Sequence, residues 1–138
     1  MSGGLESPYN PCFVCVPDNP IGLRLKFEMR DDLCVAQFTP GTHHVGYSDV
    51  VHGGLLFTAL DDVMANWLYL QNITAYTAKA SIRYRRHARV GETLSLVGEC
   101  IDRRRRRVTL RGVATEDSTG TVICETEGVF MVDPAGGS

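Results

Sequence analysis

The chain lacks the features that mark several large classes of protein. It has no run approaching the roughly 20 apolar residues that a membrane-spanning helix needs, and its first ten residues carry neither the basic nor the apolar region of a secretory signal. The formal net charge is only -2, so neither sign reaches the excess that is typical of dedicated nucleic-acid or anionic-membrane binders. We therefore expect a cytoplasmic protein with no membrane or nucleic-acid partner, although these totals are compatible with a local basic patch.

A disulfide framework is also not indicated, because the five cysteines are an odd number and no secretory signal accompanies them. Cys12 and Cys15 have the C-x-x-C spacing, but a zinc site needs four ligands, and the adjacent His43 and His44 would make a poor second pair. A thioredoxin-like pair would have to open a helix, whereas Cys15 is followed by a valine, a proline and a turn-rich segment. We expect no metal, no cofactor and reduced thiols at all five cysteines: Cys12, Cys15, Cys34, Cys100 and Cys124.

The hydrophobic pattern is the most informative feature that is present. At 138 residues the chain is long enough for a single packed domain, and we expect flexible tails over about 1–9 and 133–138. Residues 23–29 alternate apolar and polar side chains, and a turn at Asp31 and Asp32 leads into a second strand-like segment. Together these predict a hairpin, followed by a loop over residues 41–51.

From Gly53 to about Leu70 the pattern changes to a helical period, with an apolar arc too wide for an ordinary surface helix. Trp67 falls in the middle of that arc, so we expect it in the core. Four strand-like segments follow with no second helix, and in the first of them Tyr76 to Tyr84 alternate so regularly that Thr77 is predicted on the polar face. Two strands, one long buried helix and four strands indicate an α+β protein whose antiparallel sheet curls around the helix. The four segments are 76–85, 92–101, 106–116 and 121–132.

His52, Gly53 and Gly54 stand where this helix begins. One interpretation of the two glycines is structural: the chain forms a loop here that needs close backbone approach or positive φ. The other interpretation is chemical, because the first amides of a helix have no intrahelical partner and can bind a carbonyl or an oxyanion. Asp61 lies on a stripe of small residues at the edge of the apolar arc, whereas Asp62 points about 100° further round the helix. Gly53 and Asp61 are ~12 Å apart along one helix, so joint action requires a second subunit.

Several segments resemble, in order and spacing, the PaaI-like branch of the hotdog-fold acyl-CoA thioesterases. They are CFVC with DNPIGLRLKF, HHVGYSDVVHGGLLFTALDDVM, ASIRYRRHARVGETL and EGVFMV, which together run from about Asn10 to Val132. The most specific element is His-Gly-Gly with an acid nine residues after the histidine, which falls on Asp61. The resemblance implies a hotdog fold, about six strands wrapped around one long helix.

The same resemblance implies hydrolysis of an acyl-CoA thioester in a homodimer or a dimer of dimers. Gly53, at the helix start, would polarise the thioester carbonyl, and Asp61 of the facing subunit would act as general base or nucleophile. His52, which precedes Gly53, is expected in the same catalytic set. Thr77 occupies the place of an assisting Ser or Thr in relatives. The asparagine that some members carry before His-Gly-Gly is absent, with Gly46 near its place and His44, Tyr47 or Ser48 as candidate substitutes. We expect substrate contacts at Gly54, Gly46, Arg85, Arg86 and Arg89.

Five consecutive arginines, Arg103 to Arg107, are the strongest local charge. One reading is a hairpin whose solvated edge carries arginines that guard against edge-to-edge pairing. Another is a phosphate-binding row, with Arg105, Arg107 and Arg111 on one strand face, because coenzyme A carries several phosphate charges that arginine forks suit. The residues leave open which reading holds. A second class of function also stays open, a non-catalytic hotdog module that binds acyl-CoA or a protein partner. Such a module would not require an acid at position 61.

Overall fold

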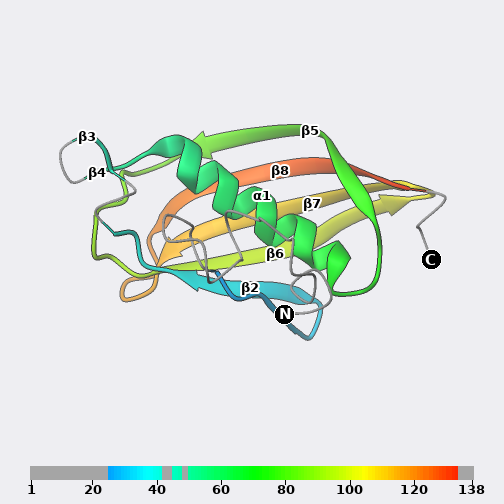
Figure 1. The fold of residues 1–138 in the computed structure, drawn as a ribbon, viewed down its shortest axis with the longest axis horizontal. Helices are drawn as coiled ribbons and strands as arrows, with labels where there is room; N and C mark the ends of the chain where they lie inside the picture. The colour runs from blue at the N-terminus through cyan, green and yellow to red at the C-terminus, as the bar shows by residue number, and fades with distance from the viewer. Residues whose placement is uncertain (1–24, 42–44, 48–49, 134–138) are drawn as a thin grey trace, which may run out of the picture.

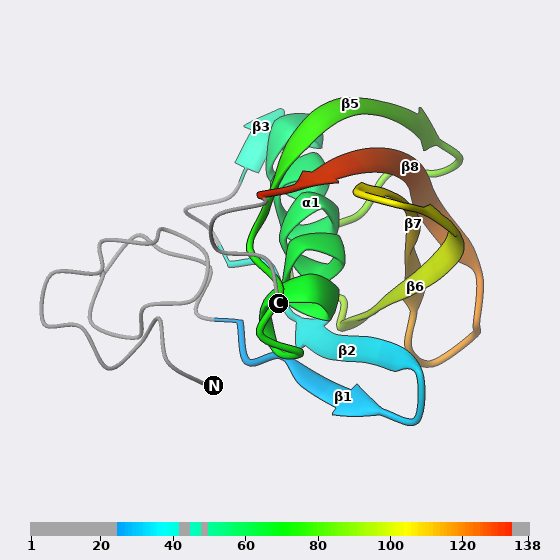
Figure 2. The same cartoon turned by 90° about the vertical axis from the view of Figure 1, so that its right-hand side faces the viewer.

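One long helix packed against an antiparallel sheet forms the protein, as the hydrophobic pattern predicts (Figure 1). The computed structural model describes residues 25–41, 45–47 and 50–133. Helix α1 spans Gly53–Tyr69, close to the bounds expected from its period. The six-stranded sheet has the order β1-β2-β6-β7-β8-β5, and it curls around the helix (Figure 2). Its strands are β1 (Glu28–Arg30), β2 (Leu33–Phe38), β5 (Ala75–Tyr84), β6 (Leu94–Arg104), β7 (Arg107–Glu116) and β8 (Val122–Val132).

Two local expectations differ from the structure. The first strand is shorter than the alternating segment 23–29, since β1 begins at Glu28, although Leu25 and Phe27 are buried before it. The expected loop 41–51 contains a small two-stranded sheet of β3 (Val45–Tyr47) and β4 (Val50–Val51). The tails 1–9 and 134–138 lie outside the described residues.

The wide apolar arc of α1 packs into the sheet, and Trp67 is buried in the core as expected, 8% exposed. Its indole N–H donates a hydrogen bond of 2.7 Å to the carbonyl of Asp32, which ties the β1–β2 turn to the last part of the helix. A buried indole needs such a partner because its N–H leaves water on folding.

Glycines on three neighbouring strands let the helix approach the sheet closely. A Cβ at Gly98 of β6 would lie 2.7 Å from the main-chain oxygen of Val63. A Cβ at Gly112 of β7 would lie 3.3 Å from the main-chain oxygen of Leu60, and one at Gly128 of β8 would lie 3.1 Å from the Met64 side chain. The contact at Gly98 is with helix backbone, which cannot rotate away as a side chain can.

We expect Gly98→Ala to lower the free energy of unfolding by about 1–3 kcal/mol, the usual cost of overpacking a core. Urea denaturation measures this change. Gly41→Ala is the matched control, because no described residue places an atom within 4 Å of a Cβ at that position. Its stability should stay within about 0.5 kcal/mol of wild type. Equal stability of the two variants would show that the helix can move off the sheet at little cost.

A β-bulge in β5 changes which residues face the helix. Thr77 pairs with Phe130 and Lys79 with Val129, so Ala78 is an extra residue without a partner in the ladder. Residues directly opposite on antiparallel strands point to the same face. Because Phe130 is 1% exposed and belongs to the core, Thr77 lies on the helix-facing side. The predicted position of Thr77 on the polar face is therefore wrong, since the alternation is interrupted one residue after it.

The arginine run forms the tip of the β6–β7 hairpin. Both strands lie inside the sheet order, so these arginines do not protect a sheet edge as one reading of the sequence supposed. Arg105 adopts φ 56° in the turn between the strands and does not share a strand face with Arg107 and Arg111. The tip lies at the end of the molecule opposite to the start of α1 (Figure 1).

Candidate functional site

The first turn of α1 leaves one glycine amide available for a ligand. His52 is the N-cap residue, and its Nδ1 accepts a hydrogen bond of 2.9 Å from the Gly54 amide. The amides of Leu55 and Leu56 both donate to the His52 carbonyl. Among the residues that the structure describes, none accepts a hydrogen bond from the Gly53 amide. His52 therefore occupies the Gly54 amide and leaves that of Gly53 as the donor at the positive end of the helix.

Tyr84, a residue that sequence reasoning missed, holds the same turn from the end of β5. Its hydroxyl donates a hydrogen bond of 2.8 Å to the Gly53 carbonyl, and its ring lies 3.2 Å from where a Cβ of residue 53 would stand. Partial burial raises the pKa of Tyr84, so the hydroxyl keeps its proton at neutral pH. The small size of Gly53 thus serves the packing of Tyr84 as well as access to the amide. A tyrosine in an alternating strand carries no local signal of this contact.

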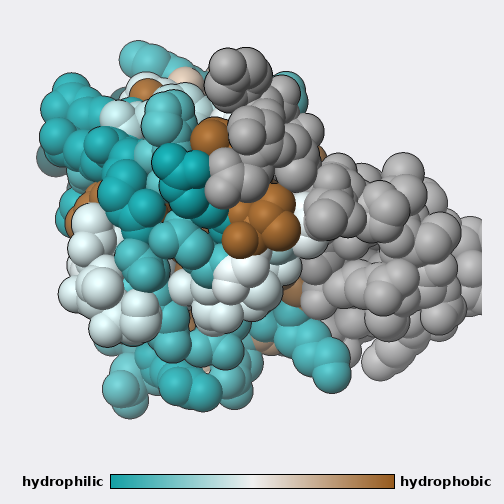
Figure 3. Space-filling model, turned by 90° about the vertical axis from the view of Figure 1, so that its left-hand side faces the viewer, coloured by the Kyte–Doolittle hydropathy of each residue, from teal (hydrophilic) through white to brown (hydrophobic). Residues whose placement is uncertain are grey.

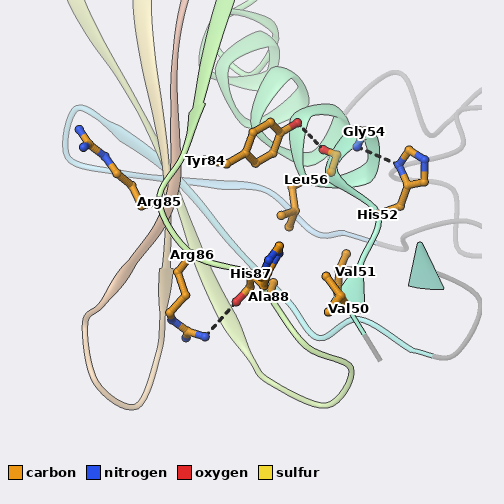
Figure 4. A pocket seen from close by; sticks show the side chains of 11 residues that line it. Val50, Val51, His52, Gly54, Leu56, Tyr84, Arg85, Arg86, His87 and Ala88 are labelled. Atoms are coloured by element: carbon orange, nitrogen blue, oxygen red, sulfur yellow. Dashed lines mark hydrogen bonds between the residues drawn. The ribbon is translucent and has the colours of Figure 1, made fainter. Parts of the chain in front are cut away.

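A pocket of about 640 Å³ opens beside this turn (Figure 4). Its walls come from β4, the start of α1 and the segment 84–88, and its apolar side chains are Val50, Val51, Leu56 and Ala88. The amide of Val51 donates to the Ala88 carbonyl at 2.8 Å, which joins the strand before the helix to the segment after β5. Figure 3 views this end of the molecule, where a small hydrophobic area lies within a largely hydrophilic surface.

Asp61 and Thr77 meet further along the helix. The Thr77 hydroxyl donates a hydrogen bond of 3.2 Å to Oδ1 of Asp61, across the interface of α1 and β5. Burial raises the pKa of Asp61 above its ordinary value, and the hydrogen bond from Thr77 opposes part of that rise. A half-buried carboxylate with a raised pKa and a hydroxyl beside it can accept a proton from water.

Asp62 has different surroundings. Burial and the neighbouring Asp61 carboxylate raise the pKa of Asp62 to about 6. The Asn66 side-chain amide donates to the main-chain oxygen of Asp62 at 2.9 Å, one turn along the same helix. The hydrogen bond with the Thr77 hydroxyl is made by Asp61. This agrees with the different positions of the two acids around the helix.

The arginines expected to bind substrate are already held by acids or main chain. Nε of Arg85 lies 2.8 Å from Glu125. Arg86 contacts Glu116 at 2.6 Å and Glu92 at 3.4 Å, and donates to the His87 carbonyl. Figure 4 shows both guanidinium groups directed away from the pocket, which Arg85 and Arg86 nevertheless line.

Two other predicted substrate contacts lie close to the pocket's walls. The main-chain amide of Arg89 donates to Glu92 at 2.8 Å, and Arg89 forms an isolated β-bridge with Val50. Gly46 lies in β3, alongside the strand that leads into α1. Tyr47 is in the same strand, whereas His44 and Ser48 fall outside the described residues.

Within the described residues no group of three or more His, Cys, Asp or Glu side chains could hold a metal ion. Burial raises the pKa of both the Cys34 and Cys124 thiols to about 12, so both are protonated at neutral pH. Cys12 and Cys15 lie outside that part of the chain. No described helix is long and apolar enough to cross a membrane.

A model of the thioesterase superfamily matches residues 49–123, which is more than half of the chain and includes both ends of the candidate site. The chain belongs to the thioesterase superfamily. No curated protein sequence gives a significant match. Thioesterases of this superfamily also appear among similar solved structures, and they share the one-helix, antiparallel-sheet arrangement of the hotdog fold.

Three structures show the range of this similarity. The thioesterase superfamily protein RHA08564 is 27% identical, with a TM-score of 0.79 over 86% of this chain and 61% of its own. A hypothetical thioesterase from Streptococcus pneumoniae in complex with coenzyme A is 23% identical, with a TM-score of 0.73 over 78% of this chain and 87% of its own. The E. coli PaaI protein of the phenylacetic acid degradation operon is 18% identical, with a TM-score of 0.76 over 84% and 83%. The resemblance to PaaI-like hotdog thioesterases is confirmed.

Proposed function

We propose that this thioesterase superfamily member hydrolyses an acyl-CoA thioester to a free acid and coenzyme A, in a dimer whose subunits share each active site. The observation that carries the proposal is the attachment of the two functional groups to opposite ends of one strand. Tyr84, the last residue of β5, bonds to Gly53, and Thr77, near its start, bonds to Asp61. Strand β5 is also an edge strand of the sheet.

Antiparallel pairing of two β5 edges would bring these ends together. Such pairing has a two-fold axis perpendicular to the sheet, so both helices lie on the same side of the joined sheet. If residues near the middle of β5 face each other, Tyr84 of one subunit lies opposite Thr77 of the other. Gly53 of one subunit then approaches Asp61 of its partner, which removes the ~12 Å separation that the two groups have along a single helix.

The chemistry follows from this arrangement. The Gly53 amide donates to the thioester oxygen, and its hydrogen bond strengthens as that oxygen gains charge in the transition state. As a general base, Asp61 of the facing subunit takes a proton from water, and the resulting hydroxide adds to the carbonyl carbon. Collapse of the tetrahedral intermediate breaks the carbon–sulfur bond and releases the coenzyme A thiolate, which takes up a proton. As a nucleophile, Asp61 would instead form an anhydride that water then cleaves. In either case the Thr77 hydroxyl orients the carboxylate.

Two similar proteins support coenzyme A as the thiol. The Streptococcus pneumoniae structure contains coenzyme A, and a Streptococcus mutans protein, 18% identical, is bound to acetyl-CoA. The pocket beside Gly53 is lined mainly by apolar side chains, as an acyl chain or the pantetheine arm requires.

The direct test is thiol release from short-chain, long-chain and aromatic acyl-CoAs, combined with mixed dimers. Gly53→Pro removes one subunit's amide donor and Asp61→Asn removes the other's carboxylate, so each variant alone should be nearly inactive. Co-expression of the two should restore about a quarter of wild-type activity, because half of the random dimers are mixed and each mixed dimer holds one intact site. An active wild type without recovery in the mixture would place both groups in one subunit's site. Binding of acyl-CoA without any hydrolysis by wild type would instead support a non-catalytic module.

A further inference from the structure

The tip of the β6–β7 hairpin carries a concentration of positive charge that the proposed reaction has not used. We define the arginine tip as residues Arg103–Arg107, all of which are exposed. Arg104 pairs with Asp102 at 3.4 Å, whereas no carboxylate of the described residues pairs with the other four. The chain as a whole has a net charge of -2, so this local excess of positive charge is set against an acidic remainder.

Other arginines of the sheet contrast with the arginine tip. Arg85 and Arg111 share Glu125 at 2.8 and 3.0 Å, and Arg86 contacts two glutamates. Each of these three guanidinium groups has a carboxylate partner inside the protomer. The charges of the tip are directed to solvent, where each exposed guanidinium group can donate two parallel hydrogen bonds to oxygens of a phosphate.

The position of the tip relates it to the start of β5. The Val132 amide donates to the Arg106 carbonyl, and the neighbouring Asp133 amide donates to Thr74, immediately before β5. The pocket lies at the Tyr84 end of the same ten-residue strand, so the two features are roughly 30 Å apart along it within one protomer. A tip is therefore too far away to contact a ligand in its own pocket. The antiparallel pairing of β5 edges places it at the pocket end of the other subunit.

We propose that the arginine tip of one subunit binds the phosphates of the acyl-CoA whose thioester lies at Gly53 of the partner. The inference rests on the proposed function and extends it to the nucleotide part of the substrate. Coenzyme A carries a diphosphate and a separate ribose phosphate, which match the cluster of exposed guanidinium groups at the arginine tip. Each active site then takes Gly53 from one subunit, and both Asp61 and the arginine tip from the other.

The test compares Arg105→Gln/Arg106→Gln with wild type on acyl-CoA and on the same acyl group carried by pantetheine. These two arginines form the turn itself, so the substitutions leave the strand pairing intact. KM for acyl-CoA should rise roughly tenfold with kcat little changed, while KM for the pantetheine thioester should not change. Lys26→Gln/Arg30→Gln removes the same charge from exposed positions near β1 and should leave both KM values at wild-type levels.

Mixed dimers locate the tip relative to the site. When Gly53→Pro and Asp61→Asn subunits are combined, the intact site takes its carboxylate from the Gly53→Pro subunit. Tip substitutions on that subunit should raise KM for acyl-CoA, and the same substitutions on the Asp61→Asn subunit should not. The reverse result would overturn the assignment between subunits.

Other results would overturn the proposal as a whole. They are an unchanged KM for acyl-CoA in the tip variant, or an equal rise in KM for the pantetheine thioester. A third is a tip variant that loses affinity for an oligonucleotide while its KM for acyl-CoA stays at the wild-type value. Direct titration with coenzyme A separates this inference from the catalytic one. If wild type hydrolyses no thioester, the proposed reaction fails, whereas an unchanged coenzyme A affinity in the tip variant contradicts the phosphate site.

Discussion

Replacing Asp61 by asparagine should lower kcat for acyl-CoA hydrolysis by about 10²-fold or more, the size expected when a general base is removed. The substitution keeps the shape of the side chain and still allows Thr77 to donate to its oxygen, so the fold should be retained. Thiol release under saturating substrate measures the effect. The loss should appear mainly in kcat, because the carboxylate acts on water rather than on the bound substrate.

Asp62→Asn is the matched control, since it removes the same charge from the adjacent position. It should retain activity within a few-fold of wild type, because the contact with Thr77 belongs to Asp61. If only the Asp62 change abolished hydrolysis, the assignment of the catalytic acid would be wrong.

The same carboxylate predicts how activity depends on pH. Only the ionised form of Asp61 accepts a proton, and burial raises its pKa above the ordinary value of 3.8. Activity should therefore be full above that raised pKa and be lost as the pH falls through it. The residual activity of Asp61→Asn should not show this loss at low pH. If the variant lost its activity at low pH in the same way as wild type, the pH dependence would belong to another titratable group.

Gly53→Pro should lower kcat/KM by about 10²- to 10³-fold, as expected from the loss of one preorganised oxyanion donor. Proline removes the amide hydrogen, yet it is tolerated as the first residue of a helix. Residue 53 is the first residue of α1, and His52 before it has φ -60° and ψ 128°, the extended conformation that precedes proline readily. The change therefore removes the donor at a position where the backbone can accept it.

Gly53→Ala distinguishes loss of the amide donor from displacement of the Tyr84 ring. Alanine keeps the amide hydrogen but adds the Cβ that lies 3.2 Å from the Tyr84 ring, a contact that proline also makes. Comparable losses in both variants would attribute the effect to displacement of Tyr84. A much smaller loss for alanine would attribute it to the amide, and circular dichroism should show similar helix content in both proteins.

Sequence alone determined the main elements, because they depend on local hydrophobic period. The change from period 2 to period 3.6 at Gly53 and the four alternating segments after the helix were enough to predict the α+β architecture, and the motif around His52 was enough to predict the family. The helical wheel also separated Asp61 from Asp62, since residues 100° apart on one helix face different surroundings whatever the rest of the chain does.

Only the tertiary structure decided which residues meet across elements. The bulge at Ala78 is one unpaired residue in an apparently regular strand, and it reverses the face of Thr77 with no trace in the alternation. The bond between Tyr84 and Gly53, the edge position of β5 and the placement of the arginine tip likewise depend on strand order. Strand order is set by contacts between segments far apart in the chain, whereas a periodic pattern reports only which side of its own segment is buried.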